Sequence, residues 1–294
     1  MSFVSDLING ADNKFDHTSL NALQKVTLRA VVMAFLFYGL AAIEGMIMRT
    51  ASVIPSIPPV YGSPEHYFSI MTVHPIVGIF GSTYQLVFGA FMFLVPFLTK
   101  KPLYSVKLAN WVWLLITVGT ALSWIAAFAW NYAPLYTLYW PLPADTEQFK
   151  TVGGIVFILG VALIMFGTFG FIYNIYATIF ARVGVHQNKT MKELLISGFG
   201  IDGILNLWYK LTGRQPYTKE PALSLPVVAI FRGTVDTFLD ALIILGAGIL
   251  VLVYLFADLG GLSLDVKSVD ALLYKNWFWW GLDLVADGLV LIYV

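Results

Sequence analysis

Six long apolar stretches constrain this chain more than any other feature. A membrane-spanning helix needs about 20 mostly apolar residues, and six segments of the 294-residue sequence meet that requirement. A soluble chain of this length would leave too much apolar surface in water, because small globules bury only part of their surface. The sequence therefore predicts an all-α, polytopic membrane helix bundle forming a single domain, 1–294, with spans at about 26–48, 67–98, 107–132, 151–181, 223–257 and 274–294.

Composition excludes several other classes of protein. Charged residues make up 12% of the chain, against about 25% in ordinary soluble domains. The 17 basic and 17 acidic residues leave no net charge, which excludes a basic nucleic-acid binder, so we expect no nucleic-acid partner. The absence of cysteine excludes disulfides, thiolate metal sites and thioether-linked haem.

Loop charges predict the orientation in the membrane. Lys100, Lys101 and Lys107 lie between the second and third spans with no acid among them, and the loop between the fourth and fifth spans is also basic. The loops after the first, third and fifth spans are neutral or acidic. Because basic loops remain in the cytoplasm, we expect a cytoplasmic N-terminus. The segment at about 193–211 is too polar to span and predicts a cytoplasmic amphipathic surface helix.

One histidine lies inside an apolar span. Of the four histidines, His17, His66 and His186 occupy polar flanks, where a solvated side chain is expected. His74 lies roughly 10 Å deep, at 1.5 Å per helical residue. An unmatched polar group in hydrocarbon costs several kcal/mol. His74 therefore either hydrogen-bonds a neighbouring helix or is an axial ligand of a membrane-embedded haem, and the chemistry alone leaves both open.

Two pairs of acids and one further acid also lie inside apolar spans, where they usually face a bundle interior or a wet cavity. Asp283 and Asp287 share one helix face and suggest a proton path, a metal site or a haem-propionate neighbour, unless a cation on an adjacent helix pairs with them. In the fifth span Asp236 and Asp240 repeat this spacing as part of a possible proton path.

An ion pair between Arg232 and Asp236 within one helix is the simpler explanation for part of that pattern, because residues four apart are neighbours on a helix surface. Glu44, in the first span, is a further candidate proton carrier.

Several sequence blocks resemble subunit I of the haem–copper oxidases. In that family the first helix ends in an arginine, and the second carries a haem-ligating histidine after a tyrosine and a threonine. Segment 135–142 is similar to an outer loop of the B-type branch, and segments 225–227 and 277–280 also have counterparts. The blocks around His74 read Met48-Arg49, a proline-rich stretch at 55–59, Ser63-Pro64-Glu65-His66-Tyr67 and Thr72-Val73-His74.

The resemblance implies that His74 is one axial ligand of a low-spin haem, of b- or a-type, near the outer face. It also places Arg49 near the haem's peripheral substituents. The residues themselves explain Arg49 slightly better as an interfacial anchor, since long cationic side chains snorkel at span ends. For the second axial ligand, Met46 and Met48 are within reach, but the family pattern favours a histidine from a separate chain.

The chain departs from the family at the start of the sixth helix. There the family has a motif whose histidine binds copper and whose tyrosine is in many members joined to a copper-ligand histidine. Aligned on Gly281, this chain has Leu282 and Ala286 at those positions; shifted by one residue, it has Asp283 and Asp287. Neither register restores the copper ligand. Copper is therefore not expected in this chain, which alone cannot form the oxygen-reducing centre.

The resemblance covers the first six of the family's usual twelve helices, and the chain ends within an apolar helix, as a split or incomplete subunit would. We expect a haem-binding, subunit-I-like component of a respiratory terminal oxidase or related electron-transfer complex, in the plasma membrane of a prokaryote. It would be inactive as an isolated chain. A partner subunit would supply the missing C-terminal helices and the second haem ligand, and an electron donor would bind at the outer face. The alternatives are a structural or assembly subunit without cofactor and a proton-coupled transporter.

Overall fold

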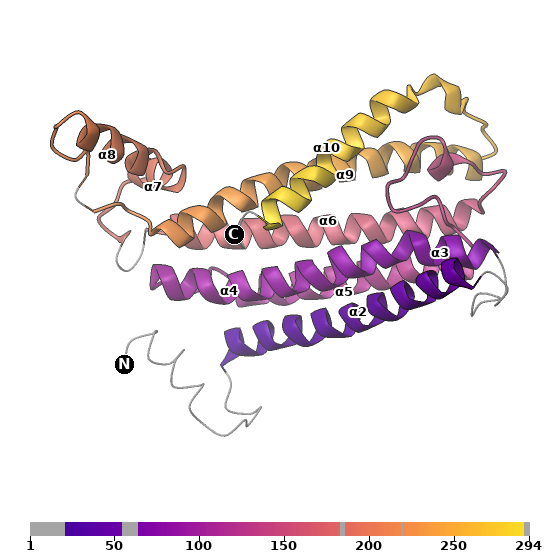
Figure 1. Cartoon of the computed structure of the whole chain (residues 1–294), viewed down its shortest axis with the longest axis horizontal. Coiled ribbons are helices and arrows are strands. Elements are labelled where there is room, and N and C mark those ends of the chain that lie inside the picture. Colours follow the sequence, from indigo (N-terminus) through magenta and orange to yellow (C-terminus); the bar gives the residue numbers. More distant parts are fainter. Residues whose placement is uncertain (1–20, 55–63, 183–185, 219, 291–294) are drawn as a thin grey trace.

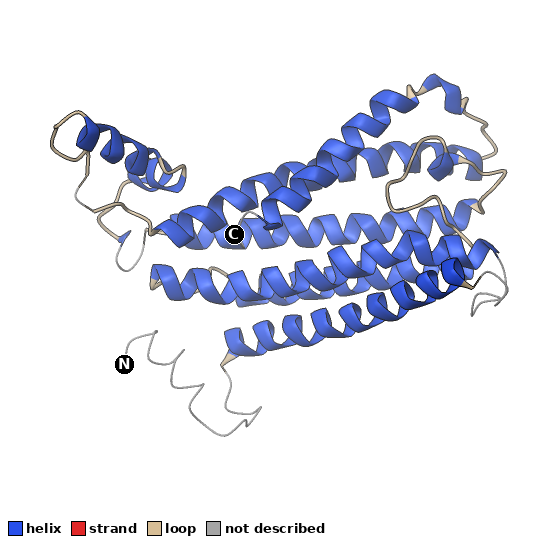
Figure 2. Cartoon of the chain, viewed as in Figure 1, coloured by secondary structure: helices blue, strands red, loops and turns tan. Residues whose placement is uncertain are grey.

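The chain forms a bundle of long, roughly parallel helices (Figure 1). A computed structural model describes residues 21–54, 64–182, 186–218 and 220–290, with only the backbone at 64–65 and 283–290. Helices are the only regular secondary structure in those ranges (Figure 2). The expected all-α membrane bundle is confirmed.

Five spans, among the described residues, are long and apolar enough to cross a membrane. The sixth expected stretch falls in α10 (Ala271–Val290) and in residues 291–294, which lie outside the described residues. The five confirmed spans are α2 (Ala22–Val53), the joined segment α3 (Pro64–Pro75), η1 (Ile76–Tyr84) and α4 (Gln85–Thr99), then α5 (Val106–Ala129), α6 (Thr151–Phe180) and α9 (Leu225–Leu259).

The second span changes its helical winding in the middle. Pro75 has no N–H and its ring crowds the preceding turn, so the regular hydrogen-bond ladder is interrupted there. The next nine residues form the π-helix η1, and the hydroxyl of Thr83 donates to the carbonyl of Gly78, 3.1 Å away. π-Helical turns are rare in proteins, but where they occur they often lie at functional sites. This one begins at Ile76, two residues after His74.

Small residues allow the helices to approach closely. A Cβ on Gly119 of α5 would lie 2.5 Å from the carbonyl oxygen of Gly160 on α6, and one on Gly89 of α4 would lie 2.7 Å from the Cβ of Ala30 on α2. Glycine at such contacts is typical of membrane helices, whose association depends on close packing. The resulting order places α2 on one side of the bundle, α6 centrally, and α9 and α10 on the other side (Figure 1).

The expected surface helix at 193–211 is two helices, α7 (Met191–Gly198) and α8 (Ile201–Leu211). Gly200 separates them with φ 69°, a left-handed conformation that only glycine adopts without strain. They lie beyond the end of the bundle at which α9 begins (Figure 1). α8 is amphipathic as expected, with an exposed apolar face and a buried Asp202.

Two basic residues expected in solvent are buried. Lys101 is fully buried, and its Nζ donates to the carbonyls of Ile179 (2.6 Å) and Ala181 (2.7 Å). These carbonyls end α6 and have no partner within the helix, so Lys101 caps it. His186 is 8% exposed. Burial lowers the pKa of Lys101 to about 8; burial, followed by the charge of Lys101, also lowers the pKa of His186.

The loop between α5 and α6, which contains η2 (Leu142–Ala144), is tied to the far side of the bundle. The indole of Trp140 donates to the carbonyl of Val266 in η4 (Val266–Ser268), 2.8 Å away, and Trp279 of α10 donates to the hydroxyl of Tyr139, 3.1 Å away. Segment 135–142 therefore holds the α9–α10 connection.

Candidate functional site

His74 lies in the last turn of α3 and faces α2. Its Nδ1 is 2.9 Å from the carbonyl oxygen of Ala41. A carbonyl can only accept, so Nδ1 is the donor, and in the neutral ring the lone pair is on Nε2. The first alternative for His74, a hydrogen bond to a neighbouring helix, is thus correct for one of its two ring nitrogens. The other nitrogen remains suited to a metal ion, since a ligating imidazole commonly donates its second N–H to a carbonyl.

The imidazole rests on a glycine of α2. A Cβ on Gly45 would lie 3.3 Å from Cε1 of His74, so a larger residue there would push the ring. Ala41 and Gly45 are one turn apart on the same helix face. Helices in such contact leave no space for a porphyrin between α2 and α3 at this level. Met46, moreover, is 63% exposed. The contact of α2 with the ring argues against a second ligand from α2, and the role of Met46 and Met48 stays a prediction.

Glu44 precedes Gly45 and faces α5. It is 3% exposed, and its Oε1 accepts a 2.7 Å hydrogen bond from the indole N–H of Trp124. Its Oε2 has no hydrogen-bond partner among the described residues. The sequence identified Glu44 but missed Trp124. The position of Trp124 in the sequence could have identified it, because it lies in the middle of a span, whereas tryptophans usually gather at the membrane interfaces.

Arg49 follows Gly45 by one helical turn and is exposed near the end of α2. This position agrees equally with an interfacial anchor and with a group beside a haem bound at His74. The role of Arg49 stays a prediction.

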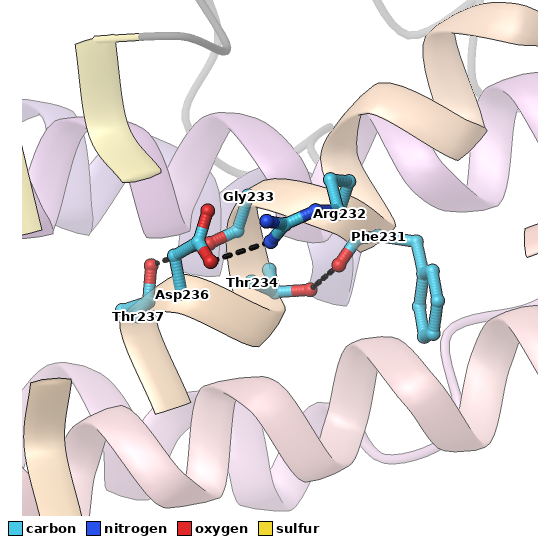
Figure 3. Close-up of polar contacts among 6 residues, drawn as sticks. All are labelled: Phe231, Arg232, Gly233, Thr234, Asp236 and Thr237. Carbon is cyan, nitrogen blue, oxygen red and sulfur yellow. Dashed lines mark hydrogen bonds and ion pairs between the residues drawn. The ribbon is translucent and has the colours of Figure 1, made fainter. Parts of the chain in front are cut away.

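A second polar cluster lies on α9. Arg232 and Asp236 form the expected ion pair within the helix (Figure 3), at 2.5 Å between Nη1 and Oδ1. One turn further, Asp240 is fully buried, and its Oδ2 accepts a 3.1 Å hydrogen bond from the hydroxyl of Tyr84. Tyr84 ends η1 and was missed by the sequence, because nothing in its neighbours predicts which span faces α9.

The two acids of α10 are described only by their backbone. The backbone of Asp283 and Asp287 is helical, but their side chains are outside the described residues. Gly281 is among the described residues. A Cβ added to it would lie 2.8 Å from the side chain of Ile243 and 3.6 Å from Oδ1 of Asp240. α10 therefore passes closely over Asp240.

The described residues contain no group of three or more His, Asp or Glu side chains that could hold a metal ion. A haem needs far less from the protein, because the porphyrin supplies four nitrogens and the chain supplies only axial ligands. A single histidine with a free Nε2 therefore fits a haem iron and does not fit a metal ion bound by side chains alone.

Comparison with known proteins agrees with this chemistry. A family model described as "Cytochrome C and Quinol oxidase polypeptide I" matches residues 25–292. The chain belongs to this family, the haem–copper oxidase subunit I family. The match does not test the B-type branch, which stays a prediction.

Individual relatives match about half of the chain. It is 30% identical over 176 residues to a "Cytochrome c oxidase subunit 1 homolog" from Agrobacterium tumefaciens, covering 52% of this chain and 28% of the relative. A homolog of the same name from Azorhizobium caulinodans is 30% identical over 176 residues, covering 54% and 29%. "Cytochrome c oxidase subunit 1" from Rhodobacter capsulatus is 29% identical over 171 residues, covering 52% and 29%.

The chain thus matches less than a third of the length of these curated relatives. No solved structure matches it.

Proposed function

We propose that this chain is a haem-binding, subunit-I-like component of a membrane electron-transfer complex of the terminal-oxidase type. His74 would hold the iron of a low-spin haem through Nε2. The single observation that carries this proposal is the hydrogen bond from Nδ1 of His74 to the carbonyl of Ala41. It fixes the ring and its tautomer, and it keeps the ligating lone pair available.

Family membership supports the same cofactor. When bound, a haem would supply one-electron chemistry. The chain's own contribution would be to orient the imidazole against Ala41 and Gly45 and to surround the site with apolar side chains, which lower the local dielectric and so tune the reduction potential.

The second axial ligand would come from another polypeptide. The contact between Gly45 and His74 argues against a thioether from α2. We propose that a partner subunit provides this ligand and the remaining helices, and that electrons arrive from a donor at the acidic end of the bundle. The basic end, with the N-terminus, would face the cytoplasm.

Copper chemistry would also belong to the partner. Gly281 is followed by Leu282 and then by acids, where the family carries its copper histidine. We expect that the isolated chain contains no stoichiometric copper and consumes no oxygen. Metal analysis and oxygen uptake check these expectations, and one copper per chain would contradict this interpretation of residues 281–287.

The haem assignment is tested by optical spectroscopy on the full chain in its native membrane, with its partners. His74→Ala should abolish the reduced-minus-oxidised haem band, or shift it if a foreign ligand binds the iron. His66→Ala is the matched control, because His66 lies on the same helix, two turns nearer its start, and should leave the band unchanged.

An identical spectrum in wild type and His74→Ala would contradict the ligand assignment. A complete absence of haem from the purified wild-type complex would instead favour a structural or assembly subunit.

A further inference from the structure

Asp240 has an unused oxygen in the interior of the bundle. Its Oδ2 is bonded to Tyr84, but its Oδ1 is buried and has no hydrogen-bond partner among the described residues. An ionised carboxylate in apolar surroundings is costly unless it is paired and fully hydrogen-bonded. A structural role alone would be served more cheaply by an amide or by an apolar side chain. The free oxygen therefore suggests that Asp240 binds something.

The space around Oδ1 limits what can bind. A Cβ added to Gly281 would be in ordinary contact with Oδ1, at 3.6 Å, so the backbone of α10 covers this oxygen. The described residues offer no group of carboxylates or imidazoles that could hold a metal ion. The hydroxyls of the nearby threonines are also committed: Thr234 donates to the carbonyl of Phe231, and Thr237 to that of Gly233 (Figure 3). A proton, with at most a water molecule, is the ligand that fits.

A polar route leads from Asp240 toward the basic end of the bundle. Asp236 is one helical turn away and is paired with Arg232 (Figure 3). The side chain of Asp236 is 11% exposed and that of Arg232 is 59% exposed. Side chains four residues apart on a helix have Cβ atoms about 5–6 Å apart. One water can therefore bridge the two carboxyl groups.

We propose that Asp240 and Tyr84 form a proton-binding site in the middle of the bundle, which exchanges protons with the basic end through Asp236. Asp240 takes a proton on Oδ1 from a water next to Asp236, and that water regains a proton through Asp236 from the basic end. The proton leaves Asp240 by the same route in reverse. The hydroxyl of Tyr84 keeps Oδ2 in place in both states. The proton on Asp240 removes the charge that would otherwise be buried.

Around α9 the described acids of this interior are Asp240 and its neighbour Asp236, and Asp240 is the more deeply buried of the two. α6 contributes Tyr176, whose charged neighbours are Arg232 and Asp236. α10 contributes Gly281, with the side chains of Asp283 and Asp287 outside the described residues. Tyr84, at the junction with α4, is the titratable group in contact with Asp240.

Infrared difference spectroscopy of the full chain, purified with its partners, tests the proposal without relying on the haem. We expect a carbonyl stretch from a protonated carboxyl group that shifts in D2O, changes with pH and disappears in Asp240→Asn. Tyr84→Phe should retain this band and shift its frequency, because the carboxyl group remains and loses one hydrogen bond. This second variant keeps the assignment testable if Asp240→Asn fails to fold.

The route is tested by the rate at which the band exchanges in D2O. Asp236→Asn should slow the exchange about tenfold, the factor that corresponds to about 1.4 kcal/mol. Asp258→Asn is the matched control. Asp258 lies on the same helix at the other end, and its oxygens accept from the hydroxyls of Thr146 and Thr151, so its loss should not change the rate.

Three results would overturn the proposal. The first is the absence of a protonated-carboxyl band at any pH at which the chain is folded. The second is a band that persists unchanged in Asp240→Asn and is lost in Glu44→Gln. The third, an exchange rate unaffected by Asp236→Asn, would overturn the route through Asp236.

Discussion

Glu44 and Asp240 are the same kind of feature in two regions of the bundle. Each is a buried carboxyl group on a membrane helix, each accepts one hydrogen bond from an aromatic side chain of another helix, and each has a second oxygen without a partner among the described residues. Glu44 lies on α2 beside the glycine that supports His74. Asp240 lies on α9, one turn from an ion pair that reaches the exposed surface.

The aromatic partners distinguish the two regions. The indole of Trp124 can only donate a hydrogen bond, whereas the hydroxyl of Tyr84 can donate and accept. Glu44 is therefore bonded to a group that is not itself titratable, next to the helix face that positions His74. Asp240 is bonded to a group that tolerates both of its protonation states, and it has a polar neighbour along α9. We therefore propose that Glu44 is a positioned acid and that Asp240 is an acid that exchanges its proton.

The largest expected effect follows from removing Trp124, the one donor to Glu44 among the described residues. Trp124→Phe should lower the free energy of unfolding by about 3 kcal/mol, because the buried carboxyl group of Glu44 loses its hydrogen-bond donor and the smaller ring leaves space beside it. Thermal unfolding in detergent measures this change. Trp111→Phe is the control, because Trp111 is 51% exposed. Adding Glu44→Leu to Trp124→Phe should restore much of the loss; an unchanged loss would show that packing of the indole, and not its hydrogen bond, is what matters.

Removing the donor to Asp240 should have a smaller effect. Tyr84→Phe should cost about 1–2 kcal/mol, because a protonated carboxyl group loses a single neutral hydrogen bond. The same unfolding measurement compares it directly with Trp124→Phe. A loss as large as that of Trp124→Phe would mean that Asp240 is charged in the folded chain, and the contrast between the two regions would fail.

The contact beneath His74 should respond to a single methyl group. Gly45→Ala should move the imidazole by a few tenths of an ångström and shift the haem band, with a stability change within about 1 kcal/mol. Gly39→Ala provides the control on the same helix, since a Cβ there has nothing within 4 Å. It should leave the spectrum unchanged. Equal spectra for all three proteins would place the haem away from His74.

The smallest effect is expected at the exposed end of the polar route. Arg232→Gln should change the free energy of unfolding by less than about 1 kcal/mol, because the pair is partly in solvent and exposed ion pairs contribute little. Unfolding at low and high salt measures it. A loss comparable to that of Trp124→Phe would show that Arg232 is buried in the native complex.

The sequence predicted the spans and the intramembrane ionisable residues because lipid imposes strong local rules: long apolar runs must be helical, and an ionisable residue such as His74, Glu44 or Asp240 stands out within them. The sequence could not predict Trp124 as the partner of Glu44 or Tyr84 as the partner of Asp240, since those contacts depend on which helix faces lie together. Charge alone also misplaced Lys101, because a basic loop residue is usually solvated and here caps the end of α6 instead.

Histidine 74 is central to this account, and a ligand-rescue measurement tests it most directly. His74→Gly should remove the low-spin haem signal from the purified complex, and added imidazole should restore it by occupying the vacated position. If the haem were bound elsewhere, His74→Gly would retain the wild-type spectrum and imidazole would not change it. That result would contradict the assignment of His74 as the axial ligand.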